Sequence, residues 1–415
     1  MTATGAESAQ ARADALRRWH AVRNVLAVRL DNLGDLLMTT PALAAIRHTL
    51  PAARITLLAS PSGAAAAAHV PVIDEVIAFD APWVKRPRPG AGDDEVRELG
   101  QLESRLVDAL AERRFDAAIV FTVCTQSALP AALLCRLAGI PRRLAHSREN
   151  PYGLLTDWVP ESDVVGAGMR HEVARQLGLV AWVGLHPQDD RLLFRFGVEH
   201  VTRLRTHMAA VGLDPARPYF VVHPGASAAS RRYPAERFGS AAETIARDSG
   251  CQAVFTGDAG EHALVEQARS RMTAPSVSLA GRLGLGELAA LIAGAQLLVA
   301  NNTGPVHIAA AVDTPVVDLY ALTNPQHTPW KVRSRVLNRD VPCRHCLKSE
   351  CPMGHHDCLR LVEADEVAQA ALELMGPLPG LPLHARLPQP QRAERSVPRA
   401  GALQAPALAA AGARP

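Results

Sequence analysis

The sequence predicts an α/β protein made of two Rossmann-like domains, each a doubly wound parallel sheet, that face a cleft. Short apolar runs of strand length alternate with longer helical stretches, a pattern typical of parallel sheets with helices on both faces. The pattern restarts at Tyr219, after the polar, proline-containing stretch 213–218. A chain of 415 residues also has the length of two domains.

Composition supports this division and excludes some classes of protein. Apolar residues make up 48% of the chain, enough to fill two cores. Aromatic residues are only 4% and the net charge is +3, so neither stacking platforms nor a basic face for nucleic acid are expected. We find no apolar run of transmembrane length and no signal peptide, and we expect a cytoplasmic protein.

The expected domains are bounded by two atypical ends. We predict an N-terminal extension at 1–20, a first Rossmann-like domain at 21–212 and a second at 213–375. The tail at 376–415 is rich in Pro, Ala, Arg and Gln without periodicity, so we expect it to be disordered. Contact of the tail with an anionic membrane surface is one possibility, raised by Arg386, Arg392, Arg395 and Arg399.

The elements follow from the same alternation. We expect first-domain strands near 25–30, 54–59, 75–79 and 116–121, with helices near 35–49, 95–113, 125–138 and 171–179. The second domain should have strands near 219–223, 252–256, 276–279, 296–300 and 315–319, with helices near 235–248, 260–272, 286–294 and 304–311. The Pro-, Gly- and Lys/Arg-containing stretch 82–94 is a flexible loop above the first sheet and a candidate lid over a second substrate.

The first candidate site is a strand–helix junction near the start of the chain. Gly34 and Asp35 follow the apolar run 25–30 and open a helical stretch. Open α/β sheets bind ligands at the carboxyl ends of their strands, so Asp35 is a candidate general base there. Asp35 is equally compatible with a simple helix cap. The segment has neither a G-x-G-x-x-G nor a Walker pattern.

Two further junctions have features of phosphate sites. After the strand 219–223, a Gly/Ser turn with Gly225 and Ser227 precedes Arg231 and Arg232, which suit a diphosphate. After the apolar run 296–300, the residues 301–307 lead directly into a small-residue helix. Its free N–H groups attract anions, and Thr303 and Gly304 add a hydroxyl and close backbone approach. The alternative is an ordinary capped turn.

Taken together, the three junctions indicate one reaction. The two phosphate-seeking turns would hold a nucleotide diphosphate on the second domain, while Asp35 faces an acceptor across the cleft. That arrangement is the geometry of sugar transfer from a nucleotide sugar, in which a base deprotonates the acceptor hydroxyl and fixed charges stabilise the departing diphosphate.

On these residues the chain resembles glycosyltransferase family 9, the ADP-heptose:lipopolysaccharide heptosyltransferases, which have the GT-B fold. The resemblance spans about 23–375 and is carried by four segments, namely 28–43, 222–234, 255–261 and 300–311. It implies an inverting transfer that requires no metal or other cofactor. The donor would be an ADP-sugar, ADP-heptose above all, and the acceptor a lipopolysaccharide-core or other cell-surface glycan or glycolipid, met at the inner face of the cytoplasmic membrane.

The resemblance also implies roles for individual residues. Asp35 matches the proposed base, and Arg232 matches a diphosphate-binding residue that is usually lysine, so it is preferred over Arg231. Thr303 and Gly304 match the pair that holds phosphate or heptose, and His307 lies in the same motif.

Around these residues the resemblance places further nucleotide and sugar contacts. The turn with Gly257 would lie beside the nucleotide, with Glu261 accepting from ribose hydroxyls or serving the helix dipole. The loop 279–288 would lie near the adenine. Asn302 departs from the aspartate frequent in the family, which leaves the donor sugar less certain than the nucleotide-sugar class.

Four cysteines near the end of the second domain form a separate cluster. Their spacing within 343–358 suggests a structural zinc before disulfides in a cytosolic chain, with an iron–sulfur cluster, reduced thiols or labile disulfides as alternatives. The candidate ligands are Cys343, Cys346, Cys351 and Cys358.

Two alternative functions remain open from the sequence. A nucleotide-sugar 2-epimerase of the same fold would need additional acid/base side chains in the cleft. A non-catalytic nucleotide-sugar-binding protein is favoured by Asn302 and opposed by the presence of Asp35.

Overall fold

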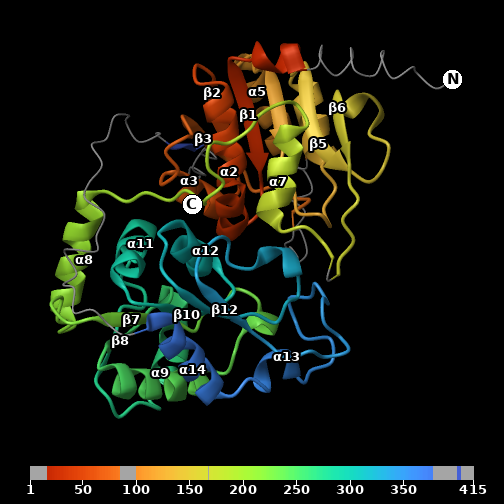
Figure 1. Cartoon of the computed structure of the whole chain (residues 1–415). Helices are drawn as coiled ribbons and strands as arrows, with labels where there is room; N and C mark the ends of the chain where they lie inside the picture. Colours follow the sequence, from red (N-terminus) through yellow and green to blue (C-terminus); the bar gives the residue numbers. More distant parts are fainter. Residues whose placement is uncertain (1–15, 85–99, 167, 377–399, 403–415) are drawn as a thin grey trace, which may run out of the picture.

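The protein contains two parallel sheets with helices on both faces, one above the other in Figure 1. The structure, a computed structural model, describes residues 16–84, 100–166, 168–376 and 400–402. The predicted fold class is confirmed, because both sheets have the same doubly wound topology. Within the described parts of the chain, no helix is long and apolar enough to cross a membrane.

The first sheet has the strand order β13-β3-β2-β1-β4-β5-β6. Its strands are β1 (Asn24–Arg29), β2 (Arg54–Ala59), β3 (Glu75–Ala78), β4 (Ala117–Val120), β5 (Arg142–Ser147), β6 (Asp157–Pro160) and β13 (Ala400–Ala402). Its helices are α2 (Leu33–Thr49), α3 (Pro61–Ala67), α5 (Gln101–Glu112), α6 (Leu129–Leu137), η1 (Tyr152–Leu154) and α7 (Glu172–Ala181).

The second sheet has the order β12-β11-β10-β7-β8-β9. Its strands are β7 (Tyr219–His223), β8 (Gln252–Phe255), β9 (Ser276–Ser278), β10 (Leu298–Asn301), β11 (Val316–Leu319) and β12 (Ser334–Leu337). Its helices and turns are α8 (Val198–Ala210), η2 (Ala229–Arg231), α9 (Ala235–Ser249), η3 (Ala259–Glu261), α10 (His262–Arg269), α11 (Leu285–Gly294), α12 (Gly304–Ala311), η4 (Pro325–His327), α13 (Asp357–Arg360) and α14 (Ala364–Met375).

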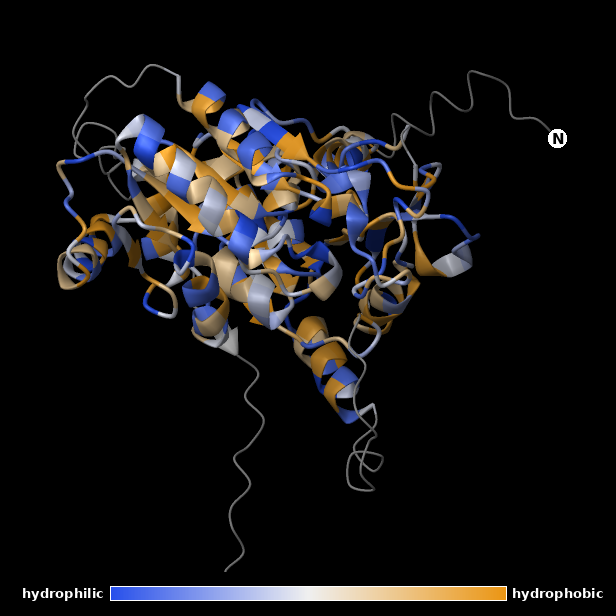
Figure 2. Ribbon diagram, turned by 90° about the horizontal axis from the view of Figure 1, so that it is seen from below, coloured by the Kyte–Doolittle hydropathy of each residue, from blue (hydrophilic) through white to orange (hydrophobic). Residues whose placement is uncertain are grey.

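The centre of each sheet is buried on both faces, which explains why the central strands are nearly continuous apolar runs. In β1, Val25 and Ala27 pack into the core beneath α2, α3 and α7, while Leu26 and Val28 pack beneath α5 and α6. The second sheet divides in the same way, with α9 and α14 on one face and α8, α11 and α12 on the other. Figure 2 shows the consequence, with orange strands and helices that carry both orange and blue residues.

The strand order places the three candidate junctions at the edge where ligands bind in such sheets. Counted within each half, the order is 3-2-1-4-5-6 in both sheets, so the direction of winding reverses between β1 and β4 and between β7 and β10. Crevices form at the carboxyl ends of strands at this reversal. The turns after β1, β7 and β10 begin there.

The predicted elements are found with small shifts, and several others were missed. The sequence did not predict α3, β5, β6, α8, β12 or α14. The strands β5, β6 and β12 contain arginine, aspartate and serine and lack an apolar run, so pairing with neighbours decides them.

The boundary between the two domains differs from the expected one. Helix α8 precedes the expected boundary at 213, yet its Leu204 and Met208 pack with Tyr219 and Leu291 of the second unit. We therefore propose that the boundary lies before Val198.

Most of the expected extension, lid and tail (1–15, 85–94, 377–399 and 403–415) lies outside the described residues. The described Ala400–Ala402 pairs with β3 as β13, contrary to the expected disorder at these three positions.

Candidate active site

A cavity of about 390 Å³ lies between the two units and brings most of the predicted site residues together. Its first-domain wall is the start of α2, with Gly34 and Asp35. The opposite wall combines the turns after β7, β8 and β10, where the lining residues include Ser227, Arg231, Gly257, Glu261, Asn302, Thr303, Gly304 and His307. Gly225 and Arg232 do not line it.

Asp35 occupies the first turn of α2 and is held on both carboxylate oxygens. Its Oδ2 accepts from the backbone N–H of Asn32 at 3.2 Å, so the helix-cap interpretation is correct as far as it goes. Its Oδ1 lies 3.4 Å from Nη2 of Arg29 and 3.8 Å from Nε2 of His327. The side chain is 13% exposed and lines the cavity, so capping the helix leaves it able to reach a ligand.

The charges around Asp35 set its basicity. Burial raises the pKa of Asp35, the buried Arg29 guanidinium opposes that rise, and Glu172 adds to it. A carboxylate with a raised pKa is a stronger base than an exposed aspartate. His327 is uncharged near neutral pH, because burial lowers its pKa to about 4.

The turn after β7 supplies the cationic wall, and here the structure differs from the prediction. Arg231 lines the cavity, and its Nε is buried without a hydrogen-bond partner among the described residues. Arg232 is exposed instead, and its Nε donates to the carbonyl of Ala226 at 2.7 Å. Arg231 ends the 3-10 helix η2 and Arg232 follows it in an extended conformation, so the two side chains leave the turn in different directions and only one lines the cavity.

Gly225 has a steric role beside the cavity rather than a place in its wall. A Cβ on Gly225 would lie 2.1 Å from Oε1 of Glu261. The glycine therefore lets the turn after β7 approach the turn after β8. Oε2 of Glu261 accepts from the N–H of Asp258 at 2.9 Å, and the other oxygen remains for a ligand.

The junction after β10 has an open helix end. Thr303 is the N-cap of α12, but its hydroxyl makes no capping hydrogen bond and instead contacts the carbonyl of Asn301 at 3.3 Å. Thr303 and Gly304 line the cavity, so their backbone N–H groups are the ones left for a ligand, since Pro305 has no N–H and that of Val306 donates to the carbonyl of Thr303 at 3.1 Å. His307 is buried in the same wall, and burial lowers its pKa to about 3, so it is neutral.

The side-chain amide of Asn302 makes hydrogen bonds within the protein that the sequence did not indicate. Its amide nitrogen donates to Oδ2 of Asp318 and to the carbonyl of His327, both at 2.9 Å. Only the amide oxygen is left to accept from a ligand. Asn302 thus ties the junction after β10 to the turn that carries His327.

Two glycines allow the helices α2 and α12 to meet across the cavity. A Cβ on Gly34 would lie 2.7 Å from Cδ2 of His307, and one on Gly304 would lie 2.7 Å from Cδ2 of Leu33. The starts of the two helices therefore interlock, which brings Asp35 opposite the open end of α12.

The four-cysteine metal site stays a prediction, because the described residues contain no preformed metal site. Within the described residues, no group of three or more His, Cys, Asp or Glu side chains is arranged to hold a metal ion. Cys343, Cys346, Cys351 and Cys358 are unpaired thiols of intermediate exposure, and Sγ of Cys343 lies 3.8 Å from Nε2 of His355. Their loop has a different contact, since Ser230 of η2 bonds to the carbonyls of Lys348 and Ser349.

Sequence reasoning missed the charged residues behind Asp35. Arg29 ends the buried strand β1, Glu172 begins α7, and His327 ends η4. Arg29 gave a usable signal, because a charged residue within an apolar strand must find a buried partner. Glu172 and His327 gave none, since they are 143 and 298 positions from Arg29 in the chain and only the fold brings them near.

Comparison with known proteins identifies the family. Residues 104–356 match glycosyltransferase family 9 (heptosyltransferase), which is more than half of the chain. This chain belongs to glycosyltransferase family 9. It is therefore an enzyme of the transferase class, as the sequence predicted.

Relatives in the family are distant but cover most of the chain. Lipopolysaccharide heptosyltransferase 2 of Salmonella typhimurium is 25% identical over 359 residues, covering 81% of this chain and 93% of its own length. Lipopolysaccharide heptosyltransferase 1 of Pseudomonas aeruginosa is 27% identical over 331 residues, with 79% and 87% covered.

Solved structures share the fold. The family 9 glycosyltransferase of Veillonella parvula superposes with a TM-score of 0.69 at 22% identity, covering 85% of this chain and 97% of its own. The ADP-heptose heptosyltransferase II of E. coli gives 0.64 at 23%, with 85% and 98% covered.

Proposed function

We propose that this enzyme transfers a heptose from ADP-heptose to a lipopolysaccharide-core or related cell-surface glycan acceptor, with inversion and without a metal. The observation that carries the proposal is the position of Asp35 opposite the open end of α12 and Arg231, across one cavity. The names of the relatives support heptose and lipopolysaccharide, and the name of the E. coli structure with the same fold supports ADP-heptose as the donor.

The second unit offers a surface for each part of an ADP-sugar. Four leucines of the stretch 279–288 form an apolar wall that suits the adenine, and Glu261 suits a ribose hydroxyl. Arg231 and the first N–H groups of α12 suit the diphosphate, since a guanidinium and a helix N-terminus both stabilise phosphate oxygens. The donor roles of Ser227, Gly257, Asn302 and His307 are proposed from their positions in the same wall.

In the proposed reaction, Asp35 takes the proton from an acceptor hydroxyl as that oxygen attacks the anomeric carbon. The bond between this carbon and the diphosphate oxygen breaks, and ADP leaves with its electron pair. Arg231 and the N–H groups at the start of α12 balance the charge that develops on the leaving diphosphate. A single displacement of this kind inverts the anomeric centre.

A second, smaller cavity suits the acceptor. It has a volume of about 140 Å³, shares Asp35 and Arg231 with the main cavity and is otherwise lined by groups such as Asp31, Ser60 and Gln126. Such hydroxyl, amide and carboxylate groups suit the hydroxyls of a sugar. We propose that the acceptor binds in this cavity. We also propose that the reaction takes place in the cytoplasm, at the inner face of the membrane.

The test combines donor binding with turnover. Thermal stability is measured with ADP, UDP, GDP, CDP, NAD and ADP-heptose, since a ligand at about 100 times its Kd adds roughly 2.7 kcal/mol. We expect stabilisation by ADP and ADP-heptose, and ADP release when a heptose-deficient lipooligosaccharide is added. Stabilisation by UDP or GDP alone would contradict the donor, and binding without release on any glycan acceptor would favour a non-catalytic binding protein.

A further inference from the structure

The side chain of Arg29 lies directly behind the candidate base and has an unusual set of partners. It is fully buried at the end of β1 and forms ion pairs with three carboxylates. Nε lies 3.1 Å from Oδ2 of Asp31, while Nη2 lies 2.9 Å from Oε1 of Glu172 and 3.4 Å from Oδ1 of Asp35. Within the described residues, the guanidinium of Arg29 makes no hydrogen bond beyond these ion pairs.

A single nitrogen of Arg29 therefore faces both Asp35 and Glu172. Glu172 is the nearer of the two and is fully buried, whereas Asp35 reaches the cavity. Because both carboxylates compete for the same nitrogen, the charge that stabilises ionised Asp35 depends on Glu172.

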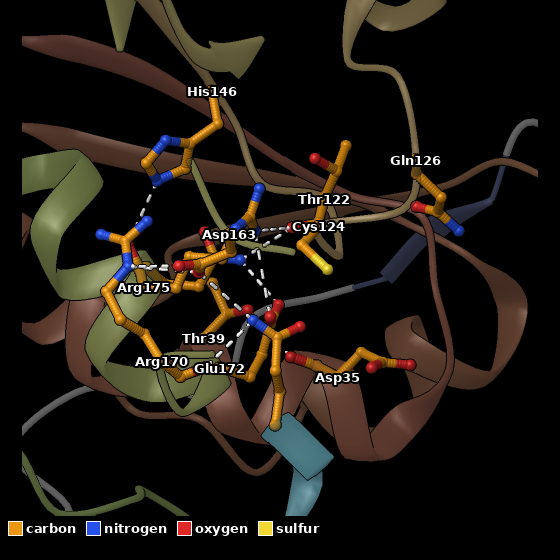
Figure 3. Close-up of polar contacts among 12 residues, drawn as sticks. Asp35, Thr39, Thr122, Cys124, Gln126, His146, Asp163, Arg170, Glu172 and Arg175 are labelled. Atoms are coloured by element: carbon orange, nitrogen blue, oxygen red, sulfur yellow. Dashed lines mark hydrogen bonds and ion pairs between the residues drawn. The ribbon is translucent and has the colours of Figure 1, made fainter. Parts of the chain in front are cut away.

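Glu172 is also held by two residues of its own helix, α7. Its Oε1 accepts from Gln176 at 2.7 Å, and its Oε2 lies 3.9 Å from Nη1 of Arg175. Arg175 is in turn bound to Glu161 at 2.5 Å. Figure 3 shows Asp35, Glu172 and Arg175 within this one polar cluster. Glu172 cannot swing away from Arg29 without giving up these contacts.

We propose that Arg29 is a positioning residue that holds Asp35 ionised and oriented, and that Glu172 limits how strongly it does so. The inference rests on the proposed role of Asp35 as the base. An aspartate paired only with a buried arginine would be a weak base, and one without any cation would be protonated near neutral pH. Sharing one cation among three carboxylates keeps Asp35 between these extremes.

The other groups that face Asp35 are few. The turn 31–35 contributes Asp31 and the N–H of Asn32, η4 contributes His327, and η2 contributes Arg231. His327 is neutral near pH 7, and Arg231 lowers the pKa of Asp35 less than Arg29 does. Arg29 and Glu172 are thus the two charges whose removal should have the largest and opposite effects.

The experiment uses the full chain and the acid limb of the pH profile of kcat, which reports the base in the enzyme–substrate complex. The variants are Glu172→Gln, which keeps shape and removes a charge, and Arg29→Met and Arg29→Lys. ADP-heptose and heptose-deficient lipooligosaccharide are the substrates. Folding is checked by circular dichroism, and donor binding by the ADP thermal shift.

We expect opposite shifts. Glu172→Gln should move the acid limb to lower pH by about one unit and lower the plateau rate, because Asp35 becomes a weaker base. Arg29→Met should move it to higher pH by about 1–3 units. Arg29→Lys keeps the charge, so its limb should stay near that of the parent, while kcat falls because one ammonium cannot bridge three carboxylates.

A matched control is Arg143→Met. Arg143 is also a buried arginine of the first sheet, 7% exposed, but it donates to backbone carbonyls of Leu154 and Gly153. Its loss should lower stability and leave the acid limb in place. A purely structural role for Arg29 and Glu172 would make their variants behave like this control.

If Arg29→Met fails to fold, Glu172→Gln and Arg29→Lys still test the inference. Infrared titration of the ¹³C-labelled aspartate carboxyls, assigned with Asp35→Asn, gives the direction without turnover. A folded Glu172→Gln whose Asp35 titrates unchanged or at higher pH would overturn the inference. Failure of the proposed function looks different, since Asp35→Asn would then retain transfer.

Discussion

The junction after β1 and the junction after β10 are built alike and behave in opposite ways. Each is a buried strand, a short turn and a helix start that faces the same cavity. At α2 the helix end is occupied by its own carboxylate, Asp35, whereas the N-cap Thr303 leaves the end of α12 uncapped. The comparison teaches that one local motif serves as base or anion site, depending on whether the chain supplies the anion itself.

The two junctions also differ in how a buried carboxyl is treated. Asp35 has the Arg29 guanidinium at 3.4 Å. Asp318, beneath the second junction, is fully buried and receives only a hydrogen bond from Asn302, so burial raises its pKa to about 8. Burial raises the pKa of both aspartates, but only at Asp35 does an adjacent cation oppose that rise.

The sharpest way to break the comparison is to remove the carboxylate of the first junction. Asp35→Asn keeps the size of the side chain and its cap to α2, yet it cannot accept a proton. We expect transfer to fall roughly 10²–10⁴-fold, the range for loss of a general base, with the ADP-induced thermal shift unchanged. Retained turnover in a steady-state assay would show that the base lies elsewhere.

The next largest effect should come from the cation that faces the open helix end. Arg231→Ala should weaken ADP binding roughly 10–100-fold, since a hydrogen bond to a charged group contributes about 1.5–3 kcal/mol. Arg232→Ala is the matched control, because this exposed neighbour does not line the cavity. Isothermal titration with ADP compares the two, and a larger loss in Arg232→Ala would restore the assignment expected from the family resemblance.

The interlock between the two junctions can be tested with matched glycine variants. Gly34→Ala places a methyl group against the buried ring of His307, and overpacking of this kind costs about 1–3 kcal/mol. Gly304→Ala meets only the end of the flexible Leu33 side chain, so its cost should be smaller. Denaturant-induced unfolding of both variants compares their free energies of unfolding. Equal values would mean that the ring of His307 moves aside freely.

The smallest effect concerns pH and stability at the second junction. The folded-state pKa of Asp318, about 8, exceeds its ordinary value of 3.8, so its contribution is complete below about pH 4 and is lost as pH rises through 8. We expect the parent Tm to fall by a few degrees more than that of Asp318→Asn between pH 5 and 9, because only in the parent does folding at this position favour the protonated carboxyl. Parallel Tm curves for the two proteins would indicate that Asp318 is ionised throughout.

Much of the site was readable from local pattern. An apolar run that ends in small or polar residues before a helix marks a strand–turn–helix unit, so Asp35, Thr303 and Gly304 could be assigned to such junctions, and all three line the cavity. The choice between Arg231 and Arg232 was not readable, because the direction of a turn side chain depends on the η2 geometry and the contact of Arg232 with Ala226.

The sequence by itself determined the alternation of strands and helices, the two-domain α/β class and the identity of the three junctions. These follow from periodicity and turn chemistry over a few residues. Only the tertiary structure decided which residues meet. The repeated strand order brings the ends of β1, β7 and β10 to one cavity, and the packing of α7 on α2 brings Glu172 to Arg29. Charge balance at a buried site is a property of such distant neighbours, so no local pattern encodes it.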